Sequence, residues 1–195
     1  MKGRNWTTDA ASMRRQDVAA GFSLRRGGQV TVQIHLGVRE RRHRLKKEAY
    51  LGEVVVAFTA CVAGRRALFQ EPGIVQDFVE VLRSSASRYA STVILFCFMP
   101  DQVHIVLRGV TPHSDVWRAM VTFKQRTGFW LKKHNSPIRW QKDFFDRVVR
   151  RDKDMMAELR YIALNPVRGG LVRDWYDYPF LGSDAFDLGD LFSAA

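Results

Sequence analysis

The sequence contains only two cysteines, Cys61 and Cys97, in 195 residues. Both lie in apolar runs that are typical of strands, so we expect two buried free thiols rather than a disulfide or a cysteine metal site. No internal repeat and no low-complexity tract is present either. Free thiols suit a reducing compartment, and we therefore expect a cytoplasmic protein.

Long apolar runs are also missing. The longest, from Val54 to Ala63, is interrupted by Thr59 and is too short to span a bilayer. The N-terminus carries basic residues but no apolar segment behind them, so we expect no signal peptide. The chain length suits one compact domain with tails, and we expect no membrane partner.

Acidic residues are scarce, and they are unevenly placed. The chain has a net charge of +11, yet the segment after Arg173 has five acidic residues and no basic one. Residues 1–173 therefore carry 31 basic against 15 acidic groups, a net charge of +16. Residues 118–151 alone hold 10 basic and 2 acidic residues, interleaved with aromatics. This pattern predicts a nucleic-acid partner, with a solvated basic surface as the alternative.

Composition divides the chain into three parts. Residues 1–50 hold 12 basic and 4 acidic residues, which predicts a partly disordered basic arm or a phosphate-binding arm. Residues 51–173 contain the regular apolar patterns of a folded domain. Residues 174–195 form an acidic C-terminal tail.

Strand and helix patterns alternate through the middle part. We expect strands at Val54–Val62, Thr92–Met99 and Val103–Arg108, a further strand within Trp140–Phe145, and helices at about Ile74–Tyr89, after Ser114 as the N-cap, and after Asp152. Thr92–Met99 is apolar on both faces, which indicates the middle of a sheet. The order predicts an α+β fold with an antiparallel sheet and helices packed on one face.

Two stretches carry the chemistry. Gln102 and His104 lie two apart on a predicted strand and share a face, while Tyr161 and Asn165 lie four apart on a helix that Pro166 is expected to stop. If strand and helix pack together, the four side chains converge as a metal site beside a tyrosine nucleophile. Taken singly, a strand histidine is more often a core residue, and Asn before Pro more often marks a helix end.

Three motifs in this order resemble one family. Phe98–Leu107 (FMPDQVHIVL) resembles the strand signature of IS200-like transposases, and Trp140–Arg150 (WQKDFFDRVVR) resembles a segment of their REP-associated tyrosine transposase branch. Tyr161–Val172 (YIALNPVRGGLV) resembles that branch's tyrosine motif. The resemblance covers about Val54 to Val172 and leaves the arm and the tail uncovered.

The resemblance implies a ferredoxin-like domain of the single-tyrosine HUH class, which acts on single-stranded DNA, often at hairpins. It implies Tyr161 as the nucleophile and His104 as the second histidine of the motif, with Asn165 as a third ligand of Mg²⁺ or Mn²⁺. The sequence departs from the family at Gln102, which stands where the first histidine is expected. A glutamine is the weaker ligand, so metal affinity is expected to be reduced or lost.

We expect a protein that nicks and joins single-stranded or hairpin DNA through a 5′-phosphotyrosine bond. The basic residues expected to contact DNA are Lys124, Arg126, Arg147, Arg150, Arg151 and Arg168. Core packing is expected for at least two of Trp140, Phe144 and Phe145, with base stacking as the alternative. A relative that binds DNA without cleaving it is the second hypothesis, and an RNA-binding ferredoxin-like domain is a weaker third, because the aromatic RNP pattern is missing. The sequence leaves a monomer and a homodimer open.

Overall fold

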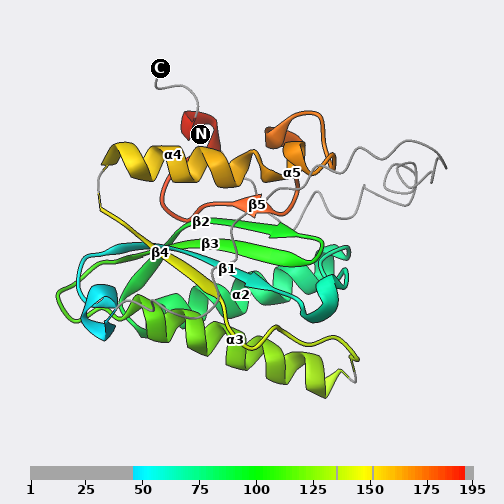
Figure 1. Cartoon of the computed structure of the whole chain (residues 1–195), viewed down its shortest axis with the longest axis horizontal. Coiled ribbons are helices and arrows are strands. Elements are labelled where there is room, and N and C mark those ends of the chain that lie inside the picture. Colours follow the sequence, from blue (N-terminus) through cyan, green and yellow to red (C-terminus); the bar gives the residue numbers. More distant parts are fainter. Residues whose placement is uncertain (1–45, 135, 151, 192–195) are drawn as a thin grey trace. The chain divides into compact units, whose positions relative to one another are not determined.

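The computed structural model describes residues 46–134, 136–150 and 152–191. The basic arm predicted for residues 1–50 thus lies almost wholly outside the described residues. The described strands are β1 (Val55–Cys61), β2 (Ser91–Met99), β3 (Gln102–Gly109), β4 (Phe145–Val149) and β5 (Leu181–Gly182). They form one antiparallel sheet in the order β4-β1-β3-β2-β5, as Figure 1 shows. The first four strands have the ferredoxin-like order, so the predicted α+β class and antiparallel sheet are confirmed.

Strand β3 is the centre of the sheet, and β2 feeds into it through the short turn at Pro100 and Asp101. Both strands are apolar and almost fully buried, as the sequence predicted. Strand β4 begins only at Phe145, the last residue of the segment Trp140–Phe145 in which a strand was predicted, and it continues to Val149. The reason is that the Trp140 and Phe144 side chains pack against the hydrophobic core, and Trp140 pairs with β1 only through an isolated bridge to Val62.

Helices α2 (Pro72–Arg88) and α3 (Val116–Lys133) cover one face of the sheet. Their buried side chains, such as Phe78 and Phe123, pack with Phe58 and Ile105 of the strands. The N-cap of α3 is Asp115, whose carboxylate accepts a hydrogen bond from the Arg118 N–H at 2.8 Å. Ser114, predicted as the cap, instead binds the loop before the helix through its hydroxyl, which accepts from the backbone N–H groups of Val110 and Thr111.

Helices α4 (Asp152–Ala163) and α5 (Asn165–Arg168) lie on the opposite face of the sheet (Figure 1). Leu159 and Ile162 of α4 pack with Cys97 and Val106, which point to the face away from α2 and α3. The expectation that the helices pack on one face therefore holds for α2 and α3 and is corrected for α4 and α5. The physical reason is visible in β2 and β3, whose second apolar face also requires a cover.

The acidic segment after Arg173 contributes to this second face. It contains η3 (Trp175–Asp177), β5 and η4 (Leu188–Leu191), and β5 pairs with β2 at Phe96 and Cys97. The buried Tyr178 hydroxyl donates a hydrogen bond to the Phe98 carbonyl at 2.7 Å. No helix among residues 46–134, 136–150 and 152–191 has the length and apolar character needed to cross a membrane.

Candidate functional site

The strand half of the site lies where β3 begins, on the face covered by α4. Gln102 and His104 both point to this face, and one row of paired residues crosses the sheet here. The row runs from Phe145 through Thr59 and His104 to Cys97. His104 is 8% exposed, and its ring nitrogens contact the Thr59 hydroxyl at 2.9 Å and the Gln102 amide nitrogen at 3.2 Å.

Arg65 completes this half, although no motif in the sequence indicated its role. It lies at the end of η2 (Ala63–Arg65), which directly follows β1. Gly64 and Arg65 both have left-handed backbone, with φ of 67° and 54°. The guanidinium Nε binds the Asp101 carboxylate at 2.7 Å, while Nη1 donates to Gln102 Oε1 at 2.8 Å. A left-handed non-glycine residue is uncommon and often marks a functional position.

These contacts fix the direction of the hydrogen bonds. A guanidinium has only donors, so the atom of Gln102 that faces Arg65 must be the amide oxygen. The amide nitrogen then donates to His104 Nε2, which leaves the ring proton on Nδ1 to be donated to Thr59. The result is a series of hydrogen bonds in which Arg65 donates to Gln102, Gln102 donates to His104, and His104 donates to Thr59.

Burial, together with the positive charges of Arg168 and Arg65, lowers the pKa of His104 from 6.5 to about 4. The imidazole is therefore neutral at pH 7, in agreement with the acceptor role of Nε2. The two guanidinium groups thus act on the same histidine.

A pH dependence of stability follows from this lowered pKa. The unfolded chain binds a proton on His104 below pH 6.5, whereas the folded chain does so only near pH 4, so stability falls as the pH falls through this window. Between pH 7 and pH 4.5, wild type is expected to lose about 2 kcal/mol more unfolding free energy than His104→Gln. Urea unfolding at the two pH values measures this, with the exposed His113→Gln as control. Equal losses in wild type and His104→Gln would contradict the burial of a neutral imidazole.

The helix half of the site lies at the junction of α4 and α5. Tyr161, on the last turn of α4, is 39% exposed. Arg168 lies against it, with the guanidinium carbon 3.8 Å from the centre of the tyrosine ring. Arg168 Nη2 donates to the Tyr161 carbonyl at 2.7 Å and also to Asn165 Oδ1. The Asn165 amide nitrogen is buried and has no hydrogen-bond partner among the described residues.

Pro166 does not stop the helical path, contrary to expectation. It falls in the first turn of α5, where a missing N–H costs little, and it separates α5 from α4 at Leu164. The backbone of Leu164 stays in the right-handed helical region, so the chain turns into α5 without a loop. This short break between the two helices allows the guanidinium of Arg168 to lie over the ring of Tyr161.

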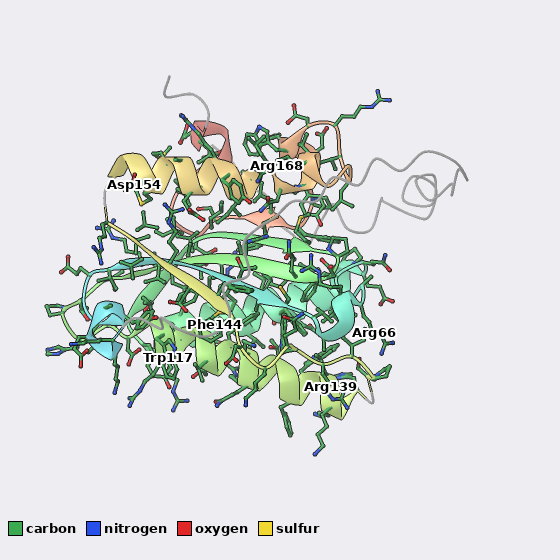
Figure 2. The ribbon with its side chains drawn as sticks, viewed as in Figure 1. Arg66, Trp117, Arg139, Phe144, Asp154 and Arg168 are labelled. Atoms are coloured by element: carbon green, nitrogen blue, oxygen red, sulfur yellow. The ribbon has the colours of Figure 1, made fainter. Side chains whose placement is uncertain are left out.

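The two halves lie on the same face and at the same end of the sheet. A Cβ atom on Gly169, the residue after α5, would lie 3.2 Å from Met99 Cε, and Met99 pairs with Gln102. The charge of Arg168 also acts on His104. Figure 2 shows Arg168 on the α4–α5 side of the sheet and Phe144 on the α3 side. The structure thus places Gln102 and His104 on the sheet face that α4 and α5 cover, and Tyr161 and Asn165 belong to these two helices.

The residues predicted to contact DNA divide between the two faces. Arg147 lies on the site face, where it pairs with Glu158 of α4 at 3.0 Å, and Arg150 is exposed just after β4. Lys124 and Arg126 belong to α3 on the other face, where Lys124 donates to the backbone carbonyls of Gln141 and Asp143. Arg151 lies outside the described residues.

Trp140, Phe144 and Phe145, the three aromatic residues just before and at the start of β4, also differ in their surroundings. Trp140 and Phe144 pack against the core, as expected for at least two of them. Phe145 is 53% exposed and stands in the same row of the sheet as Thr59 and His104. Its ring is therefore available on the site face.

Comparison with known proteins gives a consistent result. The family model for transposase IS200 like matches residues 52–163. A candidate REP-associated tyrosine transposase from Haemophilus influenzae is 25% identical over 119 residues, which cover 54% of this chain and 66% of that protein. A solved REP-associated tyrosine transposase bound to a REP hairpin superimposes with a TM-score of 0.62 at 19% identity, over 72% of this chain and 81% of the other. The latter likeness shows a shared fold.

Proposed function

Because the chain belongs to the IS200-like transposase family, we propose that it binds single-stranded DNA folded into hairpins and that Tyr161 attacks a phosphodiester of that DNA. The observation that carries this proposal is the exposed Tyr161, which lies against Arg168 on the face of the sheet that holds His104. The solved relative bound to a REP hairpin supports DNA of the same kind as the ligand. This substrate also agrees with the cytoplasmic location expected from the sequence.

The proposed reaction exchanges one ester for another. The Tyr161 oxygen forms a bond to phosphorus, the bond from phosphorus to the 3′ oxygen breaks, and the phenol proton ends on the released 3′ hydroxyl through solvent. The product is a 5′-phosphotyrosine bond, which a free 3′ hydroxyl reverses without a further energy source. No oxidant, reductant or nucleotide is needed for this balance.

Arg168 is suited to hold the phosphate at Tyr161. Its Nη2 is engaged with the helix, while Nε and Nη1 have no hydrogen-bond partner within the described part of the chain. A guanidinium binds two phosphate oxygens with parallel hydrogen bonds and stabilises the charge that develops on them. The exposed ring of Phe145 is placed on the same face for stacking on a base.

The family is generally metal-dependent, and Mg²⁺ or Mn²⁺ was predicted from the sequence. The residues present do not fit such an ion as they are placed. Gln102 Oε1 accepts from Arg65, His104 Nε2 accepts from Gln102, and Asn165 Oδ1 accepts from Arg168. The proposed reaction therefore contains no step at a metal ion.

A second candidate function is DNA binding without cleavage. The observation that favours it is Gln102, which stands where the family has a histidine and which is already paired with Arg65. Both candidates require the same DNA-binding face, and they differ only in whether a covalent protein–DNA bond forms.

The DNA-binding part of the proposal predicts a strong salt dependence. The exposed Arg150 follows β4 beside the site face, and replacing it with Gln should lower the slope of log affinity against log salt by about 0.7. Fluorescence anisotropy with a labelled hairpin at several salt concentrations measures this slope. Arg118→Gln on α3 is the control and should leave the slope unchanged. Hairpin binding that does not vary with salt in wild type would contradict the proposal.

A further inference from the structure

We propose that Arg65 and Arg168 together bind the substrate phosphate in this site and take the place of the divalent metal ion. The proposal rests on the proposed function, since it specifies how the same site holds DNA. It assigns a phosphate-binding role to Arg65, which no motif of the sequence indicated.

The first argument concerns the atoms that a metal would need. Imidazole nitrogen and amide oxygen bind a metal through lone pairs, and in this site each of these atoms already accepts a hydrogen bond from the protein. Arg65 Nη1 lies 2.8 Å from the Gln102 oxygen, and the Gln102 nitrogen lies 3.2 Å from His104 Nε2. An ion would have to displace the Gln102 nitrogen from the single lone pair of His104 Nε2, and it would have to share the Gln102 oxygen with the positive charge of Arg65.

The second argument concerns charge. The site contains two guanidinium groups, and within the described part of the chain the one carboxylate that contacts either of them, Asp101, is paired with Arg65 at 2.7 Å. Two guanidinium groups against one carboxylate leave a net positive charge at the site, which repels a dication and attracts a phosphate.

The third argument concerns available donors. Arg65 Nη2 has no hydrogen-bond partner within the described residues, and its side chain is 53% exposed, so it can reach a ligand in solvent. The buried Asn165 amide nitrogen also lacks an acceptor among the described residues. A phosphate between the two arginines offers oxygens for these donors, and the left-handed backbone at Arg65 holds that side chain at the end of β1.

Hairpin binding in EDTA and in Mn²⁺ provides the first test. Wild type is expected to bind a labelled hairpin with equal affinity, within about twofold, in both buffers. Arg65→Gln should weaken binding about tenfold or more, because a charged hydrogen bond to phosphate is lost. Arg65→Lys should recover part of the lost affinity, since lysine restores the positive charge but not the paired hydrogen bonds that a planar guanidinium makes to phosphate. Arg66→Gln is the matched control, because this neighbouring exposed arginine contacts Pro137 instead, and a change below twofold is expected.

Binding of Mn²⁺ to the protein alone provides the second test. Electron paramagnetic resonance of free Mn²⁺ should show no stoichiometric uptake by wild type. The double variant Arg65→Gln, Gln102→His removes the competing guanidinium and supplies a second imidazole, and it is expected to take up one ion. Circular dichroism and thermal unfolding of each variant verify that the fold is retained.

The two tests separate the two proposals. One Mn²⁺ bound by wild type, together with hairpin binding that is lost in EDTA, would overturn the arginine site while leaving the proposed function intact. Absence of hairpin binding in both buffers would overturn the proposed function, and with it the phosphate-binding role of Arg65.

Discussion

Replacing Tyr161 with phenylalanine is expected to abolish the covalent protein–DNA adduct and to leave hairpin binding within about twofold of wild type. Only the attacking oxygen is removed, while the ring that Arg168 covers at 3.8 Å remains. Since the 5′ phosphate stays on the protein, a hairpin labelled at its 3′ end should migrate with the wild-type chain on a denaturing gel. If Arg65 and Arg168 replace the metal, this adduct also forms in EDTA.

Tyr176→Phe is the matched control for this experiment. Tyr176 is 43% exposed, close to the 39% of Tyr161, but it lies in η3 of the C-terminal segment. The control should retain the adduct. An adduct that persists in Tyr161→Phe would identify another nucleophile, and a wild-type chain that binds the hairpin tightly without any adduct would support binding without cleavage.

Truncation after Arg173 is expected to remove most of the stability of the domain, by more than about 5 kcal/mol, which approaches the total stability of a typical domain. The deletion removes Leu181 and Leu191 from the hydrophobic cluster on the site face and uncovers Cys97 and Leu95 beneath them. It also removes the hydrogen bond from Tyr178 to the Phe98 carbonyl. Urea unfolding followed by circular dichroism measures the loss.

A shorter truncation, after Leu191, retains all of these contacts and serves as the control. Gly182→Ala tests the packing of β5 against β2 with a single added carbon atom. The alanine Cβ would lie 2.3 Å from the ring of the buried Phe96. A loss of about 2 kcal/mol is expected for this overpacked contact. Near-wild-type stability of the chain truncated after Arg173 would show that the segment is dispensable for the fold.

The sheet and the helices α2 and α3 were predictable because each has a strong local pattern. The alternation along β3 identified Gln102 and His104 as neighbours on one face, and helical spacing predicted Tyr161 and Asn165 as neighbours on a single helix, whereas the structure divides them between α4 and α5. The double-sided apolar character of β2 already required a cover on both faces, but residue patterns do not say which later segment supplies it. The second face was therefore assigned only by the structure, to α4, α5 and β5.

The place of Arg65 in the site was not predicted, for a different reason. Its role depends on a left-handed backbone after β1 and on contacts with Asp101 and Gln102, which follow more than thirty residues later. No spacing rule links such residues before the strands are paired. Arg168 was predicted to contact DNA, but its place over Tyr161 was not predicted, because it depends on the break between α4 and α5 at Leu164.

The two outer strands of the described sheet are short, with five residues in β4 and two in β5, whereas β2 and β3 in the interior have nine and eight. An open strand edge is a template on which another chain can add a strand, and short or charged edges limit this. Arg147 on β4 adds a charge at one edge, and the two residues of β5 leave almost no template at the other. Both edges of the described sheet therefore offer little backbone on which the sheet of a second molecule could add.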